Sequence, residues 1–135
     1  MSDNFAIEVT QSGNLDAVID RVTEALKAEG FGILTRIDVH DVLKAKIDVD
    51  FRPYTILGAC NPVLAHQALS ARADIGLMLP CNVTVEKSGD NECLVRFINP
   101  MAMMTFGDLG QNETLARLGG EAGEKIKRAA TALGH

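Results

Sequence analysis

The residues with the greatest potential for chemistry lie close together, between Arg52 and His66. Cys60 ends a strand-like run there and directly precedes Asn61-Pro62, a pair that is typical of the start of a helix. Unpaired backbone N–H groups and the helix dipole favour a thiolate at such a position. His66 follows about one turn into the same helix, so it could approach Cys60 or point elsewhere. The stretch indicates a reactive thiol assisted by a histidine, the start of a metal site, or a buried small thiol in the core.

The sequence contains two more cysteines, and Cys81 is the more informative of them. It follows Pro80 in a strand-like segment, where the sheet could bring it next to Cys60 as a metal ligand or a redox partner. The alternative for Cys81 is a core position beside a proline bulge. For Cys93, a simple packing role in the core is favoured more strongly still. No C-x-x-C pair is present, and two thiols with His66 fall short of the ligand set of a structural zinc site. The sequence therefore leaves the metal and any cofactor unknown.

Two arginines, Arg36 and Arg52, stand inside strand-like segments, where an unpaired guanidinium would be costly. Several aspartates lie between positions 38 and 50 and offer partners for both of them. Ion pairing with these aspartates and binding of an anionic ligand are the two alternatives for this pair.

The composition argues against several classes of partner. The chain of 135 residues has 13 basic and 18 acidic side chains and a formal net charge of −5 at pH 7. With no basic run, this balance argues against nucleic acid and against an anionic membrane surface as partners. No apolar run approaches the ~20 residues of a membrane span, and residues 1–4 lack the pattern of a signal peptide. We therefore expect a cytoplasmic protein with reduced thiols.

The hydrophobic patterning predicts one domain over residues 1–135, in which strands and helices alternate before a hairpin. Apolar residues alternate with others over positions 5–10, which indicates a strand, and recur at spacings of three and four after Asn14, which indicates a helix ending at Gly30. The expected strands are Phe5–Thr10, Phe31–Asp38, Arg52–Cys60, Gly76–Lys87 and Glu92–Asn99. The expected helices follow Asn14 and Asn61 and cover Asp41–Ile47 and Asn112–Leu133.

These elements predict an α+β fold, a two-layer sandwich with a largely antiparallel sheet of about five strands and helices packed on one face. In the last hairpin, one set of alternate residues should enter the core from each strand. The two sets are Cys81, Val83 and Val85, and Cys93, Val95 and Phe97. The short helix Asp41–Ile47 should turn Val42, Leu43 and Ile47 inward. We expect the flexible side chains of the methionines at 101, 103 and 104 to fill space in the core or at an interface.

Several segments of the chain together carry a family resemblance: Gly30–Val39, Asp50–Tyr54, Leu57–Pro62 with His66, and Leu79–Val83. They look like the domain of unknown function family 302 over nearly the whole chain. The resemblance implies a small α+β domain, often a homodimer, with no established activity. The residues that recur in the family fall on Arg52, Cys60, Asn61, Pro62, His66, Pro80, Cys81 and Asn82. They imply a shared site or a shared structural feature at the end of the third strand. Asn99 differs from the family, in which an acidic residue is expected before Pro100.

Three functional hypotheses follow. The first is a homodimeric module that binds a small ligand or a metal ion near Cys60, His66 and Cys81, and it is favoured because no complete catalytic constellation is present. Further ligand-binding candidates are Arg52, Asn61 and Asn82. The second is a thiol-based redox or transfer enzyme with Cys60 as the nucleophile and His66 as the base or orienting group. The third is a structural or interaction protein with no site, so whether the protein is an enzyme stays open.

Overall fold

The computed structural model describes residues 5–134 and contains a five-stranded sheet with the strand order β1-β5-β4-β3-β2. All neighbouring strands in this order run antiparallel. The strands are β1 (Ala6–Ser12), β2 (Gly32–Asp38), β3 (Tyr54–Cys60), β4 (Cys81–Gly89) and β5 (Glu92–Ile98). The helices are α1 (Leu15–Ala28), α2 (Val39–Ile47), α3 (Pro62–Ala71), α4 (Pro100–Met104) and α5 (Glu113–Ala132), with 3-10 turns η1 (Ala73–Met78) and η2 (Gly107–Gln111). The predicted α+β sandwich with an antiparallel sheet is confirmed, whereas α4 was not expected.

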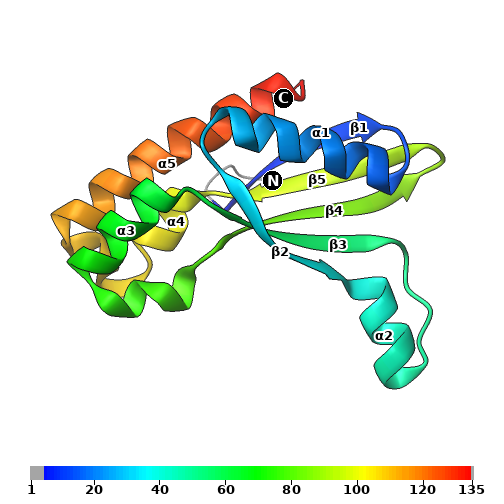
Figure 1. Ribbon diagram of the computed structural model, residues 1–135, viewed down its shortest axis with the longest axis horizontal. Coiled ribbons are helices and arrows are strands. Elements are labelled where there is room, and N and C mark those ends of the chain that lie inside the picture. Colours follow the sequence, from blue (N-terminus) through cyan, green and yellow to red (C-terminus); the bar gives the residue numbers. More distant parts are fainter. Residues whose placement is uncertain (1–4, 135) are drawn as a thin grey trace.

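Helices α1 and α5 lie across the same face of the sheet (Figure 1). The side-chain oxygen of Asn14 accepts a hydrogen bond of 2.9 Å from the backbone N–H of Ala17, so α1 begins with the N-cap that the sequence predicts. The apolar stripe of this helix is buried as expected: Val18, Ile19, Val22 and Leu26. Burial of this stripe holds α1 against the sheet.

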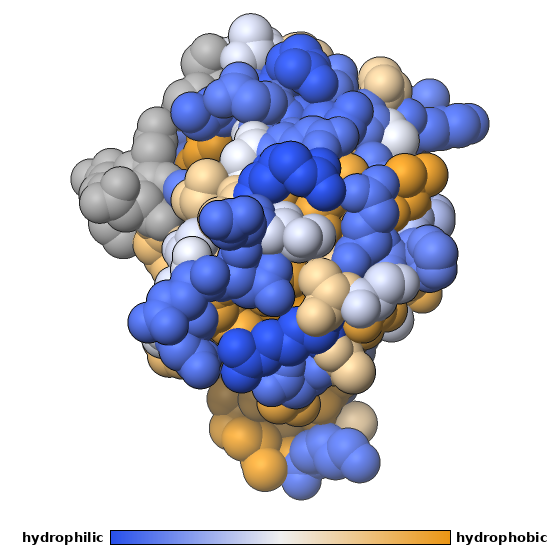
Figure 2. Space-filling model, turned by 90° about the vertical axis from the view of Figure 1, so that its left-hand side faces the viewer, coloured by the Kyte–Doolittle hydropathy of each residue, from blue (hydrophilic) through white to orange (hydrophobic). Residues whose placement is uncertain are grey.

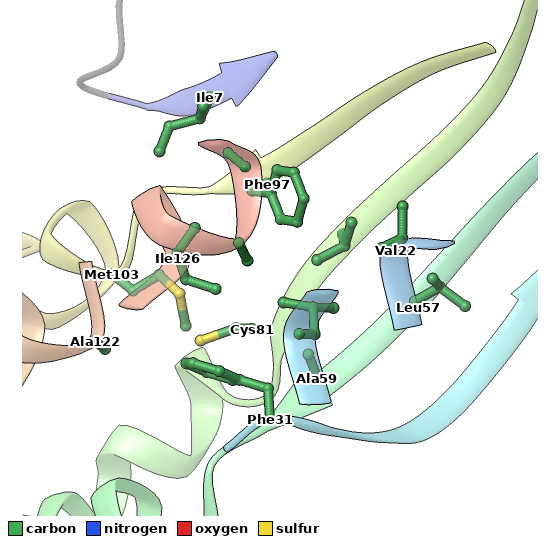
Figure 3. Packing of buried hydrophobic residues seen from close by; sticks show 14 of the residues in the cluster. Ile7, Val22, Phe31, Leu57, Ala59, Cys81, Phe97, Met103, Ala122 and Ile126 are labelled. Atoms are coloured by element: carbon green, nitrogen blue, oxygen red, sulfur yellow. The ribbon is translucent and has the colours of Figure 1, made fainter. Parts of the chain in front are cut away.

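The core lies between the sheet and these two helices, and Figure 3 shows Val22 and Ile126 there with Leu57 and Phe97 of the sheet. The hairpin of β4 and β5 contributes two rows to it, with Val83 opposite Phe97 in the register. All the alternate residues predicted for this role are buried: Cys81, Val83, Val85, Cys93, Val95 and Phe97. The hairpin therefore buries both rows together, as its alternation predicts.

Helix α5 runs through three glycines without a break. At Gly119, an added Cβ would lie 3.0 Å from the Cβ of Met104 and 3.2 Å from the Cα of Met101. The missing side chain therefore lets α4 pack closely on α5, which places Met103 and Met104 in the core. Among residues 5–134, no helix has both the length and the apolar character needed to cross a membrane.

The segment before β4 differs from the expected long strand. Residues up to Met78 form the turn η1, and the strand begins only at Cys81, after a cis Leu79-Pro80 peptide bond. Pro80 lies over β3, because a Cβ added to Gly58 would stand 2.8 Å from its Cγ. A proline outside the ladder is consistent with its missing N–H donor. The segment thereby forms a wall above one end of the sheet.

Helix α2 projects away from the rest of the molecule (Figure 1). It contains no buried residue, and the side chains of Val42 and Ile47 are 43% and 62% exposed. The prediction that Val42, Leu43 and Ile47 face inward is therefore wrong for Val42 and Ile47, because no layer of the core extends beneath this helix, while Leu43 is half-buried. In Figure 2, hydrophobic residues gather at the lowest part of the molecule, where α2 lies.

Candidate functional site

The predicted thiol site is a narrow crevice where β3 ends and β4 begins. Cys60 and Cys81 both line it, so the sheet brings these two thiols to one place as the sequence suggests. The crevice has a volume of about 30 Å³ and is otherwise walled mainly by apolar side chains, Phe31, Leu64 and Leu118 among them. Sites for small molecules usually have about 300–1,000 Å³. The crevice is therefore too small for an organic ligand.

Burial governs the acid–base state of the thiols. It raises the pKa of Cys60 above its ordinary value. It also raises the pKa of Cys81 to about 11, with a smaller contribution from the charge of Cys60. The start of α3 was expected to favour a thiolate at Cys60, but the raised pKa favours the protonated thiol. Both groups are protonated thiols at neutral pH, a state that weakens them as nucleophiles.

The predicted partner of Cys60 lies elsewhere. His66 is exposed on α3, it does not line the crevice, and no hydrogen bond joins it to Cys60. Asn61 has a structural role, because its side-chain oxygen accepts a hydrogen bond from Leu64 N at 3.2 Å and its amide donates to the carbonyl of Glu29 at 3.4 Å. Within residues 5–134, no three histidine, cysteine or acidic side chains are placed to hold a metal ion.

A larger pocket, of about 440 Å³, lies at the sheet. Its floor includes Thr84 of β4 and Arg96 of β5, which alternate with the core residues Val83 and Val95 and so face away from α1 and α5. Asn82, a predicted ligand residue, lies on the same face and lines the same pocket. The walls are largely apolar: Phe5, Leu77, Met78, Leu79, Pro80, Ile98 and Met103. We call this space the sheet pocket.

A chain of four charged side chains crosses the same face of the sheet beside the pocket. Arg96 donates from Nε to Glu8 Oε2 at 2.8 Å and from Nη1 to Glu86 Oε1, while Arg52 donates to Glu86 Oε2. Glu86 is only 5% exposed. Its burial alone would raise its pKa, but the hydrogen bonds from Arg52 and Arg96 hold the pKa below the ordinary value. The two arginines thereby keep a nearly buried carboxylate ionised.

The two arginines identified in the sequence are both paired. Arg36 contacts Asp38 at 3.1 Å and Asp16 at 3.2 Å, which matches the ion-pairing alternative. Arg52 instead pairs with Glu86, and its guanidinium lies 4.5 Å from the ring centre of Phe51. The predicted residue Arg52 therefore belongs to the charged chain beside the sheet pocket.

The floor of the sheet pocket contains a hydroxyl without a partner. Within the described residues, Thr84 Oγ1 is buried and makes no hydrogen bond. Leaving a buried polar atom unpaired costs about 1–3 kcal/mol. Because the hydroxyl has no bond to lose, its rotation toward a bound molecule would be inexpensive.

Sequence reasoning missed Thr84, Glu86 and Arg96, although the strand alternation contains the signal. The apolar rows of β4 and β5 predict the core, and the residues between them must face the other side of the sheet. The opposite row of β4 holds Asn82, Thr84 and Glu86, whereas that of β5 places Arg96 between Leu94 and Ile98. Glu86 is nearly buried there, so its charge needs a partner.

Two comparisons with known proteins agree with this fold. The model of the family described as "Domain of unknown function DUF302" matches residues 7–133. The crystal structure of an uncharacterized conserved protein DUF302 from Bacillus stearothermophilus is similar, with a TM-score of 0.83 and 25% sequence identity. The similarity covers 96% of this chain and 98% of that chain. A search of curated proteins finds no relative.

Proposed function

Because the chain belongs to the domain of unknown function family DUF302, whose description gives no activity, we propose a function from its geometry: it binds a small organic molecule in the sheet pocket. The observation that carries the proposal is the pocket itself. Its volume of about 440 Å³ falls in the range of known ligand sites, and it combines apolar walls with a few convergent polar groups.

The floor of the pocket supports binding because it is rigid. Thr84 and Arg96 face each other across β4 and β5, two central strands that each pair with neighbours on both sides. Arg96 is held further by the carboxylates of Glu8 and Glu86. A guanidinium that is fixed before binding loses little conformational entropy when the ligand enters.

The lining favours binding over turnover. The described residues that line the sheet pocket include no cysteine, histidine, aspartate or glutamate, so they offer no nucleophile paired with a base. The thiol enzyme remains a hypothesis with less support, because the pKa of Cys60 is raised and His66 lies apart from it. A metal ion at Cys60 and Cys81 has no third ligand there to support it.

The homodimer stays a prediction, and exposed apolar residues at one edge of the molecule support it. Edge strand β2 leaves Leu34 66% and Ile37 46% exposed, and Ile47 of the adjoining α2 is 62% exposed. An edge strand offers unpaired backbone groups that a second copy can meet about a two-fold axis. Light scattering over a range of concentrations tests it, because a monomer at every micromolar concentration would contradict the dimer. The cytoplasmic location likewise stays a prediction.

Ligand-observed and protein-observed NMR with a library of small fragments tests the proposed function. We expect fragments that shift the amide signals of residues 82–84 and 96–98. Asn82→Trp should abolish these shifts, because the side chain of Asn82 is exposed and the larger ring would fill the pocket without entering the core. Thr10→Trp is the matched control, since Thr10 is exposed on β1 outside the pocket. Shifts that survive Asn82→Trp, or no shifts at millimolar fragment, would contradict the proposal.

A further inference from the structure

The charges beside the sheet pocket restrict what it can bind. Arg96 is the one charged side chain that lines the pocket within the described part of the chain. Two of its nitrogens already donate to carboxylates, Nε to Glu8 and Nη1 to Glu86. An anion in the pocket would therefore meet a guanidinium that is already neutralised, with two carboxylates just behind it.

The charge balance also includes Arg52. Glu86 is shared between Arg96 and Arg52, so two positive and two negative groups form one connected chain with a net charge of zero. The side chains of Arg96 and Glu8 are 35% and 36% exposed, so water screens them only in part. Binding of a positively charged ligand is also unfavourable, because the charge nearest to the pocket is the guanidinium of Arg96.

Besides Arg96, the described side chains with polar groups that line the pocket are Tyr54, Asn82 and Thr84, which suit an uncharged partner. Asn82 carries both a donor and an acceptor, and the hydroxyl of Thr84 can act as either. The guanidinium offers donors only. Leu77 and Met78 of η1 and Ile98 of β5 add apolar surface to the lining, which favours a hydrocarbon body.

We propose, on the basis of the proposed function, that the ligand of the sheet pocket is an uncharged amphipathic molecule: an apolar body whose single polar group, such as a carbonyl or amide, meets Thr84, Asn82 and Arg96. Carboxylates, phosphates and amines of the same shape are disfavoured. The carbonyl oxygen of the ligand would accept from the floor, and the apolar body would lie against the walls.

Three probes with a similar apolar body and different head groups test the effect of charge: 4-phenylbutyramide, 4-phenylbutyrate and 4-phenylbutylamine. Each is titrated at neutral pH while the amide signals of the pocket residues are followed by NMR. We expect the amide to bind at least about fivefold more tightly than either charged probe. Equal or tighter binding of the carboxylate or the amine would overturn the choice of an uncharged ligand and leave the binding function intact. No shift with any of the three overturns this class of ligand, and the fragment library then decides the function separately.

Glu8→Gln tests the electrostatic reason directly. Removing one carboxylate changes the net charge of the four groups from zero to +1, so the affinity for the carboxylate probe should rise relative to the amide by about fivefold. Glu24→Gln makes the same change in total charge at an exposed position on α1 and should leave the ratio unchanged. An unchanged ratio in Glu8→Gln would show that the charge balance does not set the preference.

Discussion

Arg96 of β5 donates to the carboxylate of Glu86 on the neighbouring strand β4, on the face of the sheet opposite the hydrophobic core. Glu86 is nearly buried, and both of its carboxylate oxygens are paired, one with Arg96 and the other with Arg52. This ion pair stands beside the sheet pocket and fixes the position of Arg96, the one charged side chain among residues 5–134 that lines it. Both the stability of the face and the chemistry of the pocket therefore depend on it.

Replacing Glu86 with Gln should destabilise the protein. The amide cannot accept from both arginines as the carboxylate does, so Arg52 or Arg96 loses its bond at this position, while Arg96 keeps its bond to Glu8. We expect the free energy of unfolding in urea to fall by about 1–3 kcal/mol. Glu24→Gln, at an exposed site on α1, serves as the control and should change it by less than about 0.5 kcal/mol. Equal effects of the two changes would show that the buried ion pairs contribute nothing to stability.

The ion pairs of Glu86 also make the stability of the protein depend on pH. The pKa of Glu86 is held below its ordinary value in the folded state, so its ion pairs stabilise the protein above the ordinary glutamate pKa. This contribution is lost as the pH falls through the folded pKa. The native protein should therefore lose more stability than Glu86→Gln between about pH 6 and pH 3. Urea unfolding of both proteins across this range measures the difference, and parallel curves would contradict it.

The thiols should react slowly in the folded protein. Cys81 and Cys93 are buried, and the pKa of Cys81 is raised to about 11. We expect iodoacetamide at pH 8 to leave both unmodified in the native state and to modify Cys60 more slowly than a free thiol, because burial also raises its pKa. All the thiols should react once urea unfolds the chain. Mass spectrometry of the digested protein gives each rate, and fast native alkylation of Cys60 would restore the thiol-enzyme hypothesis.

The fold was predictable where local pattern and tertiary contact agree. Alternation in the hairpin placed Val83 and Phe97 in the core, and Asn14 capped its helix as its side chain suggests. The exposure of Ile47 was not predictable, because its pattern shows one apolar helix face but not whether another element covers that face.

The site was harder to predict than the fold. Cys60 and His66 were predicted from their residue types. Their chemistry depends on burial and on helix orientation, and neither can be inferred from the spacing of the residues. The sheet pocket is assembled from η1 and from strands that are distant in sequence, so its walls come together only in the folded chain. Asn82 was predicted through the family resemblance, whereas Arg96 stands between Leu94 and Ile98 on its row of β5 and had no local signal beyond its charge.

Two threonines on neighbouring strands should respond oppositely to the same change. Thr55 Oγ1 is buried and donates to Asp38 Oδ1 at 2.7 Å, whereas Thr84 Oγ1 has no partner within the described chain. Valine has nearly the same shape, so Thr55→Val should lower the free energy of unfolding by about 1–3 kcal/mol. Thr84→Val should leave it unchanged or raise it, because it removes an unpaired hydroxyl. Urea unfolding measures both, and similar losses would show that Thr84 has a bonding partner in solution.

Gly58 should tolerate no side chain, because two groups occupy the space beside it. An added Cβ would lie 2.2 Å from Thr35 Oγ1 and 2.8 Å from the Cγ of Pro80, which forms part of the pocket wall. We expect Gly58→Ala to lower the free energy of unfolding by about 1–3 kcal/mol and to shift the amide signals of Asn82 as Pro80 moves. Gly32→Ala, where nothing lies within 4 Å of the added Cβ, is the matched control and should be neutral or slightly stabilising. Because Thr35→Ala removes only one of the two contacts, the double variant should recover part of the loss. Full recovery would mean that Pro80 does not press on β3.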